Sequence, residues 1–196
     1  MKNNIILIGY MGCGKSTIGR QLAKKLKVSF LDTDAWIEEK EGITISEIFA
    51  TKGEGYFRDK ETECLKFFLK EKQTESYLEE NCGELSKEEQ EQIFYVISVG
   101  GGLPVREENQ KLLKQLGHVI YLKAKPDTIY ERIKGDTTRP LLQTENPLQK
   151  IREMMLSREE KYQAAAHEVL SVDGKSIGKI VDEIMKEKMK RENSCN

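Results

Sequence analysis

A glycine-rich turn between an apolar run and a helical pattern constrains this 196-residue chain more than any other feature. Residues 9–16 read GYMGCGKS and match the pattern G-x-x-x-x-G-K-[ST] in full. The β-branched run Ile5–Ile8 before it predicts a buried parallel strand, and apolar residues at helical spacing in Ser16–Leu26 predict a helix directly after it. Such a turn binds phosphate when it lies between a strand and a helix.

The chemistry of this turn suits a nucleoside triphosphate. Glycines let successive backbone N–H groups face phosphate oxygens, and the helix N-terminus adds positive potential. Lys15 is expected to reach the β- and γ-phosphates, and the Ser16 hydroxyl to be a ligand of Mg²⁺. The alternative is a flexible turn that happens to contain a lysine, and the agreement of strand, turn and helix argues against it.

The rest of the chain alternates between strand and helix patterns. Further strands are predicted at Val28–Leu31, Ile93–Val99, His118–Leu122 and Val169–Val172. Further helices are predicted at Thr44–Ala50, Tyr56–Glu71, Gln110–Leu116, Pro126–Ile133, 147–166 and 176–190. This alternation predicts an α/β protein with three α/β/α layers, in which helices cover both faces of a central parallel sheet.

The length predicts one domain over residues 1–196, because a single core can bury most of its apolar surface. The segment 71–92 holds eight acidic residues against two lysines, which predicts a solvated helical insertion or a mobile segment. The charged tail 186–196 is expected to fray after Met185.

Bulk composition narrows the class of protein. With 32 Lys and Arg against 33 Asp and Glu, the charge balance predicts neither a nucleic acid nor a membrane as partner. The first apolar run is too short for a membrane span and has no signal-peptide cleavage pattern. The four cysteines form no C-x-x-C pair, so we expect a reduced cytoplasmic enzyme without a zinc ribbon.

Two aspartates follow the second predicted strand. Residues 30–36 read FLDTDAW, and in an extended chain Asp32 and Asp34 point the same way. Because ligands bind outside the carboxyl ends of parallel strands, both should face the γ-phosphate. One carboxylate would then hold Mg²⁺ directly or through water, and the other would accept a proton from an attacking hydroxyl. The alternative is that Asp34 caps a helix beginning at Ala35, which explains one aspartate and not both.

Two weaker signals lie further along the chain. Arg58 stands near a predicted helix start, within Gly53–Glu61. The run Gly100–Gly102 ends the most strand-like segment and would expose backbone amides to a closely bound ligand. A simple break between strand and loop is the alternative for the glycines.

Five motifs occur in a characteristic order over about residues 4–184: the phosphate-binding turn, D-x-D, F-R-x-x-E, G-G-G and R-P-L-L. In the identity and order of these motifs the chain resembles the shikimate kinase family, a compact branch of the nucleoside-monophosphate-kinase-like P-loop enzymes. The resemblance implies ATP-dependent phosphorylation of a shikimate hydroxyl to shikimate 3-phosphate, a step of aromatic amino-acid biosynthesis. It also implies Mg²⁺ as cofactor, ATP and shikimate as the small-molecule substrates, and a monomer.

The resemblance also assigns residues that hold ATP and the metal. Those expected to bind ATP are Gly12, Cys13, Gly14, Lys15, Ser16, Thr17, Arg132 and Arg139. Ser16 would be a metal ligand, and Asp32 would support the metal through its water shell. Arg132 matches the position that packs on adenine in the family, and a solvated helix arginine is the alternative.

The acceptor side follows from the same resemblance. Residues expected to bind shikimate are Asp34, Arg58, Gly100, Gly101, Gly102 and Arg158. Those expected to be catalytic are Asp34, Lys15 and Arg139. Arginine suits the acceptor's carboxylate because its fork of donors engages both oxygens.

A mobile lid is expected at about residues 134–146, carrying Arg139 to the transferring phosphoryl group. Asp136 makes this lid less positive than its basic residues alone suggest. Arg158 is part of an R-x-x-x-Y element that ends at Tyr162.

Two other functions are weighed against this prediction. Another small acceptor, such as gluconate or a nucleoside monophosphate, would fit the phosphate-binding turn, but the arginines and glycines favour a small carboxylated polyol. A non-catalytic homologue could bind nucleotide and use its acidic segment as an interaction module. Loss of Lys15, Asp34 or Arg139 would favour that reading, and all three are present.

Overall fold

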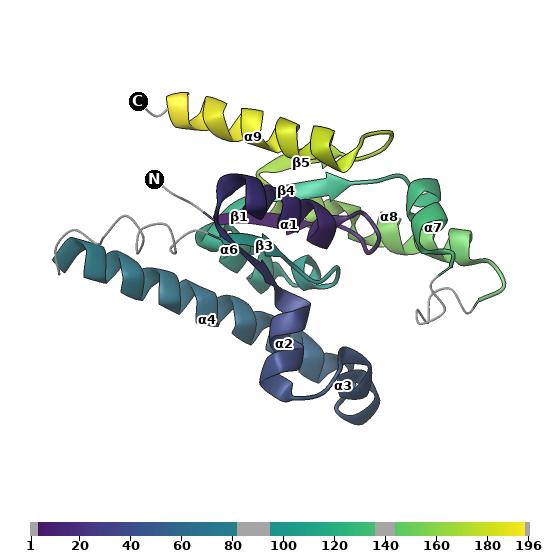
Figure 1. Cartoon of the computed structure of the whole chain (residues 1–196). Helices are drawn as coiled ribbons and strands as arrows, with labels where there is room; N and C mark the ends of the chain where they lie inside the picture. Colours follow the sequence, from purple (N-terminus) through teal and green to yellow (C-terminus); the bar gives the residue numbers. More distant parts are fainter. Residues whose placement is uncertain (1–3, 82–94, 136–143, 195–196) are drawn as a thin grey trace.

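The computed structural model describes residues 4–81, 95–135 and 144–194, which form a central sheet with helices packed on it (Figure 1). The sheet is parallel throughout, with the strand order β2-β3-β1-β4-β5. Its strands are β1 (Asn4–Ile8), β2 (Ser29–Asp32), β3 (Tyr95–Ser98), β4 (Gly117–Lys123) and β5 (Glu168–Ser171). In register, Leu7 of the central strand lies opposite Ser98 and Ile120.

Helices cover both faces of this sheet, as predicted. The helices of the described residues are α1 (Lys15–Leu26), α2 (Thr33–Glu41), α3 (Ile45–Thr51), α4 (Gly53–Asn81), η1 (Leu103–Val105), α6 (Glu107–Leu116), α7 (Pro126–Ile133), α8 (Pro147–Ala165) and α9 (Ile177–Ser194). Helix α1 packs on β1, β2 and β3 and against α9, while α6 and α8 pack on β4 and against each other. Every residue of β1 is buried, as expected for a strand covered on both sides. The predicted three-layer α/β/α class is confirmed.

Helix α4 is longer than the sequence pattern predicts. It begins at Gly53 instead of Tyr56 and runs to Asn81, so the first part of the acidic segment 71–92 is helical. Residues 82–92 lie outside the described residues. Figure 1 shows the C-terminal part of α4 extending beyond the sheet, while its N-terminal half packs against α2, α3 and α6. Despite its length, neither α4 nor any other helix in the described ranges is long and apolar enough to cross a membrane.

Several predicted boundaries move. Strand β2 ends at Asp32, one residue later than predicted, and β3 begins at Tyr95 because residues 93–94 lie outside the described part of the chain. Helix α9 continues to Ser194, four residues beyond the predicted end at residue 190, and fraying after Met185 stays a prediction. Arg191 Nη1 pairs with Glu168 Oε2 at 2.7 Å, which ties the end of α9 to β5. Of the predicted lid, residues 136–143, which include Arg139, lie outside the described ranges.

Candidate active site

The phosphate loop, residues 9–14, joins β1 to α1 and depends on glycine. Gly12 and Gly14 have φ values of 76° and 101°, a left-handed region that side chains other than glycine rarely adopt. A Cβ atom on Gly12 would also lie 2.7 Å from Ile133 Cγ2. The loop can therefore turn tightly enough to direct backbone N–H groups at a bound phosphate.

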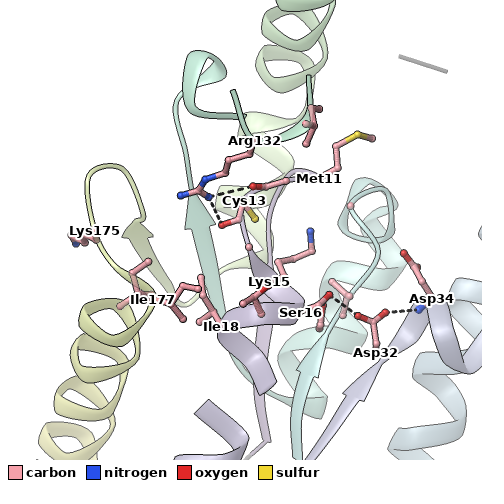
Figure 2. A pocket seen from close by; sticks show the side chains of 18 residues that line it. Met11, Cys13, Lys15, Ser16, Ile18, Asp32, Asp34, Arg132, Lys175 and Ile177 are labelled. Carbon is pink, nitrogen blue, oxygen red and sulfur yellow. Dashed lines mark hydrogen bonds between the residues drawn. The ribbon is translucent and has the colours of Figure 1, made fainter. Parts of the chain in front are cut away.

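A cavity of about 590 Å³ opens beside this loop (Figure 2). The phosphate loop and the start of α1 line one side, and Asp32 and Asp34 line another. Lys15 Nζ donates to the carbonyl oxygens of Gly9 at 2.9 Å and Tyr10 at 3.3 Å, so the ammonium group is held over the loop.

The paired aspartates differ from each other in what they bind. Asp32 accepts hydrogen bonds from Ser16 Oγ at 2.8 Å and from the backbone N–H of Asp34 at 3.1 Å. Asp32 is thus the N-cap of α2, which begins at Thr33, and the alternative in which Asp34 caps a later helix is wrong. The strand ends at Asp32 and Asp34 stands in the first helical turn, so their common orientation does not come from an extended chain. Both still line the cavity (Figure 2).

Asp34, which is half-buried at the cavity, and Glu61, which is fully buried, form an acidic pair. The Oδ1 atom of Asp34 and the Oε1 atom of Glu61 are buried without a hydrogen-bond partner among the described residues. Burial, together with the nearby charge of Asp32, raises the pKa of Asp34 to about 6, with Lys15 and Arg58 opposing the rise. Burial raises the pKa of Glu61 to about 7, against the lowering effect of Arg58. Both carboxyl groups therefore titrate near neutral pH.

The glycine run, Gly100–Gly102, brings this pair together with Arg58. A Cβ atom on Gly100 would overlap Asp34 Oδ1 and lie 2.9 Å from Glu61 Oε1. A Cβ atom on Gly102 would overlap the Arg58 guanidinium. A side chain at Gly100 or Gly102 would therefore displace the ends of these side chains from their places beside the loop.

Two acidic residues on α4 hold Arg58 in place. Its Nη1 lies 2.9 Å from Glu61 Oε2, and its Nη2 lies 2.8 Å from Glu54 Oε1. Glu61 is fully buried, whereas Glu54 is largely exposed. The motif F-R-x-x-E contains Glu61, but no role was predicted for it. Its spacing of three residues from Arg58, one helical turn, is the signal that could have found the pair.

Arg158 contacts the glycine run from α8, 57 residues further along the chain than Gly101. Its Nη1 donates to the carbonyl oxygen of Gly101 at 3.4 Å, and its guanidinium lies 5.9 Å from the centre of the Tyr10 ring. The structure thus gathers Asp34, Arg58 and Arg158 around the three glycines.

Arg132 contacts the phosphate loop. Its Nη1 donates to the carbonyl oxygens of Gly12 at 3.2 Å and Cys13 at 3.0 Å (Figure 2). The residue is exposed on α7, as the alternative of a solvated helix arginine expects, and it also binds the loop. Packing on adenine stays a prediction. Beyond Arg132 the cavity continues to Lys175 and Ile177, which the sequence analysis did not single out.

The parallel sheet and the phosphate loop after its central strand place the chain in the class of P-loop kinases. Comparison with known proteins narrows the class: a family model described as shikimate kinase matches residues 11–76 and 75–188. The chain belongs to the shikimate kinase family.

Similar proteins agree with this assignment over nearly the full chain. The chain is 38% identical over 184 residues to a shikimate kinase of Thermodesulfovibrio yellowstonii, and the match covers 94% of each chain. It is 41% identical over 182 residues to one of Thioalkalivibrio sulfidiphilus, covering 93% of this chain and 85% of the relative. Shikimate kinase from Acinetobacter baumannii in complex with shikimate matches with a TM-score of 0.79 and 33% identity, over 96% of this chain and 94% of that one.

Proposed function

We propose that the chain transfers the γ-phosphoryl group of ATP to a hydroxyl of shikimate, giving shikimate 3-phosphate and ADP in aromatic amino-acid biosynthesis. The observation that carries this proposal is the position of Asp34. Its carboxylate lines the cavity beside the phosphate loop and also contacts the glycine run, near Arg58. One carboxylate therefore lies between a triphosphate site and a site for a carboxylated polyol.

On the phosphate side, the chain supplies positioning and positive charge. Lys15 would exchange the carbonyl oxygens of Gly9 and Tyr10 for phosphate oxygens, while loop N–H groups hold the rest of the triphosphate. Because these groups are in place before reaction, they stabilise the transition state at little reorganisation cost. Arg132 would keep the loop in shape through its contacts with two loop carbonyls, and its guanidinium would pack on adenine.

The residues beside the loop fit Mg²⁺. Ser16 Oγ and Asp32 Oδ2 are hard oxygen donors 2.8 Å apart, the kind of atom that Mg²⁺ prefers. Over the described ranges no group of three or more His, Cys, Asp or Glu side chains could hold a metal alone, which suits a metal that arrives with the nucleotide. Ser16 would ligate it directly and Asp32 through water. When bound, Mg²⁺ would neutralise charge on the phosphate oxygens.

On the acceptor side, the chain orients shikimate and takes its proton. Arg58 and Arg158 would pair with the carboxylate, and the glycine run would let the ring approach closely. Asp34 would accept the hydroxyl proton as the hydroxyl oxygen bonds to the γ-phosphorus and ADP leaves. A pKa of about 6 keeps most of this carboxylate ionised at neutral pH while making it a stronger base than an ordinary aspartate.

We propose that Arg139 completes the site from the lid at about residues 134–146, and that the enzyme acts as a cytoplasmic monomer within a single domain. The cysteines of the described residues, Cys13 and Cys64, are free thiols, which suits a reducing compartment.

The test is ADP release from MgATP with shikimate, gluconate, AMP or no acceptor. We expect release with shikimate alone. Release with another acceptor would keep the triphosphate site and remove the assignment of Arg58 and Arg158. ATP binding without release for any acceptor would instead favour a nucleotide-binding protein without kinase activity.

A further inference from the structure

The glycine run is held in place by two different kinds of hydrogen bond. The first and last carbonyl oxygens of Gly100–Gly102 accept backbone N–H groups of the following 3₁₀ turn, at 3.1 and 3.0 Å. The middle carbonyl, that of Gly101, accepts instead a 2.6 Å hydrogen bond from the hydroxyl of Tyr162 on α8. Helix α8 therefore controls the orientation of the central peptide of the run.

That orientation decides where the next backbone N–H points. The peptide between Gly101 and Gly102 is trans, so its carbonyl and its N–H point in opposite directions. With the carbonyl directed at Tyr162, the N–H of Gly102 points away from α8. In the part of the chain that the structure describes this N–H makes no hydrogen bond, and Gly102 lies beside the Arg58 guanidinium, where the acceptor carboxylate is proposed to bind.

The same carbonyl connects Tyr162 to an arginine of the site. Arg158 stands one helical turn before Tyr162 on α8, and its Nη1 donates to the Gly101 oxygen at 3.4 Å. We propose that Tyr162 is a positioning residue for the acceptor: through the Gly101 carbonyl it orients the Gly102 N–H and Arg158 toward the shikimate carboxylate. This inference rests on the proposed function, since it needs a carboxylated acceptor at the glycine run.

Tyr162 is well suited to a fixed role of this kind. It is buried, with 1% of its surface exposed, and burial raises the pKa of its hydroxyl to about 12, so it stays protonated and donates at neutral pH. Its ring lies against that of Tyr121, with centroids 5.1 Å apart. A tyrosine held on all sides in this way loses little further freedom when it binds the carbonyl.

The neighbouring Tyr121 offers a matched control. It is equally buried, but its hydroxyl donates to Glu159 at 2.8 Å and not to the glycine run. Lys123 of β4 also binds Glu159, at 2.6 Å, so α8 keeps this anchor to the sheet when the Tyr121 hydroxyl is removed. Phenylalanine at either position keeps the ring contact and removes one hydroxyl.

The experiment compares Tyr162→Phe with Tyr121→Phe in the full chain, by steady-state kinetics and thermal unfolding. For Tyr162→Phe we expect KM for shikimate to rise about fivefold, the usual net effect of one hydrogen bond, and KM for ATP to change by less than about twofold. Tyr121→Phe should leave both KM values unchanged. Each variant loses one buried hydroxyl, so we expect the two to lower the unfolding temperature by similar amounts. An unchanged KM for shikimate in Tyr162→Phe, or an equal rise for both substrates, would reduce Tyr162 to a core residue.

A double variant tests whether Tyr162 and Arg158 are coupled through the Gly101 carbonyl that both bind. Because Tyr162 acts partly through Arg158, combining Tyr162→Phe with Arg158→Ala should raise KM for shikimate by less than the product of the single effects. Independent, multiplying effects would contradict the coupling. Failure of the proposed function looks different, because the unaltered enzyme would then release no ADP in response to shikimate.

Discussion

The two halves of the active site are built in opposite ways. The phosphate side comes from one contiguous stretch, residues 9–17, together with Arg132 and Asp32. The acceptor side combines side chains from α2, α4 and α8 around the glycine run that follows β3. Only the strand order, with β3 between β1 and β2, brings these segments beside the phosphate loop. Phosphate binding is thus encoded locally, whereas acceptor binding depends on the assembled sheet.

Electrostatics separate the two halves as well. Lys15 and Arg132 on the phosphate side already bind backbone carbonyl oxygens, so their charges are stabilised before ATP arrives. On the acceptor side, Asp34 and Glu61 each keep a buried oxygen without a partner among the described residues. Removing or titrating a carboxyl group should therefore affect the acceptor side more than the phosphate side.

The largest effect is expected for Asp34→Asn. Asparagine keeps the shape and loses the base, so kcat should fall by roughly 10²- to 10⁴-fold, the usual contribution of a general base. ATP affinity should stay close to that of the unaltered enzyme, since the phosphate loop is intact. Shikimate-dependent ADP release and an ATP titration measure the two quantities. Normal turnover would remove Asp34 from the chemistry.

The phosphate side and most elements of the fold could be predicted from the sequence, because both depend on local patterns. The parallel strands, the helix after the loop and Lys15 all follow from residues close together in the chain. The residues of the acceptor side were predicted from the resemblance to the shikimate kinase family and not from local patterns. Physical reasoning alone could not tell that β2 runs one residue further and makes Asp32 the helix cap. It also could not find the Tyr162–Gly101 bond, which joins residues 61 positions apart.

The next largest effect is expected for Arg58→Ala, which tests whether the acceptor side binds a carboxylate independently of ATP binding on the phosphate side. Arg58→Ala should raise KM for shikimate at least about tenfold, or about 1.4 kcal/mol if KM tracks affinity. KM for ATP should change little. Lys60→Ala is a matched control on the same helix, because Lys60 pairs with Glu41 and Glu63 and not with the glycine run. If both variants behave alike, the carboxylate is bound elsewhere.

A pair of glycine substitutions should separate the two halves directly. Gly102 has a φ of −93°, which alanine adopts freely, and its added methyl group would meet the movable end of Arg58. Gly102→Ala should therefore raise KM for shikimate by about fivefold with little loss of stability, an effect of ~1 kcal/mol. Gly12→Ala should instead raise KM for ATP and lower the unfolding temperature, because the backbone itself is strained there by about 1–3 kcal/mol. Kinetics for both substrates in both variants would show whether the halves respond separately.

The smallest effect concerns stability without substrates. The raised pKa values of Asp34, about 6, and Glu61, about 7, mean that the folded chain binds more protons than the unfolded chain near neutral pH. Their contribution is complete at acidic pH and is lost as pH rises through these values.

The Glu61→Gln variant isolates this contribution, because glutamine keeps the size of the side chain and does not titrate. Between about pH 6 and about pH 8 the unaltered enzyme should lose about 1 kcal/mol more unfolding free energy than the variant. His167 has a lowered pKa and gives the opposite trend, but it is present in both proteins and cancels in the difference. Denaturant unfolding at both pH values measures that difference. If the unfolding free energies of the two proteins changed in parallel with pH, Glu61 would already be ionised in the folded chain. The difference between the phosphate side and the acceptor side would then rest on geometry and not on electrostatics.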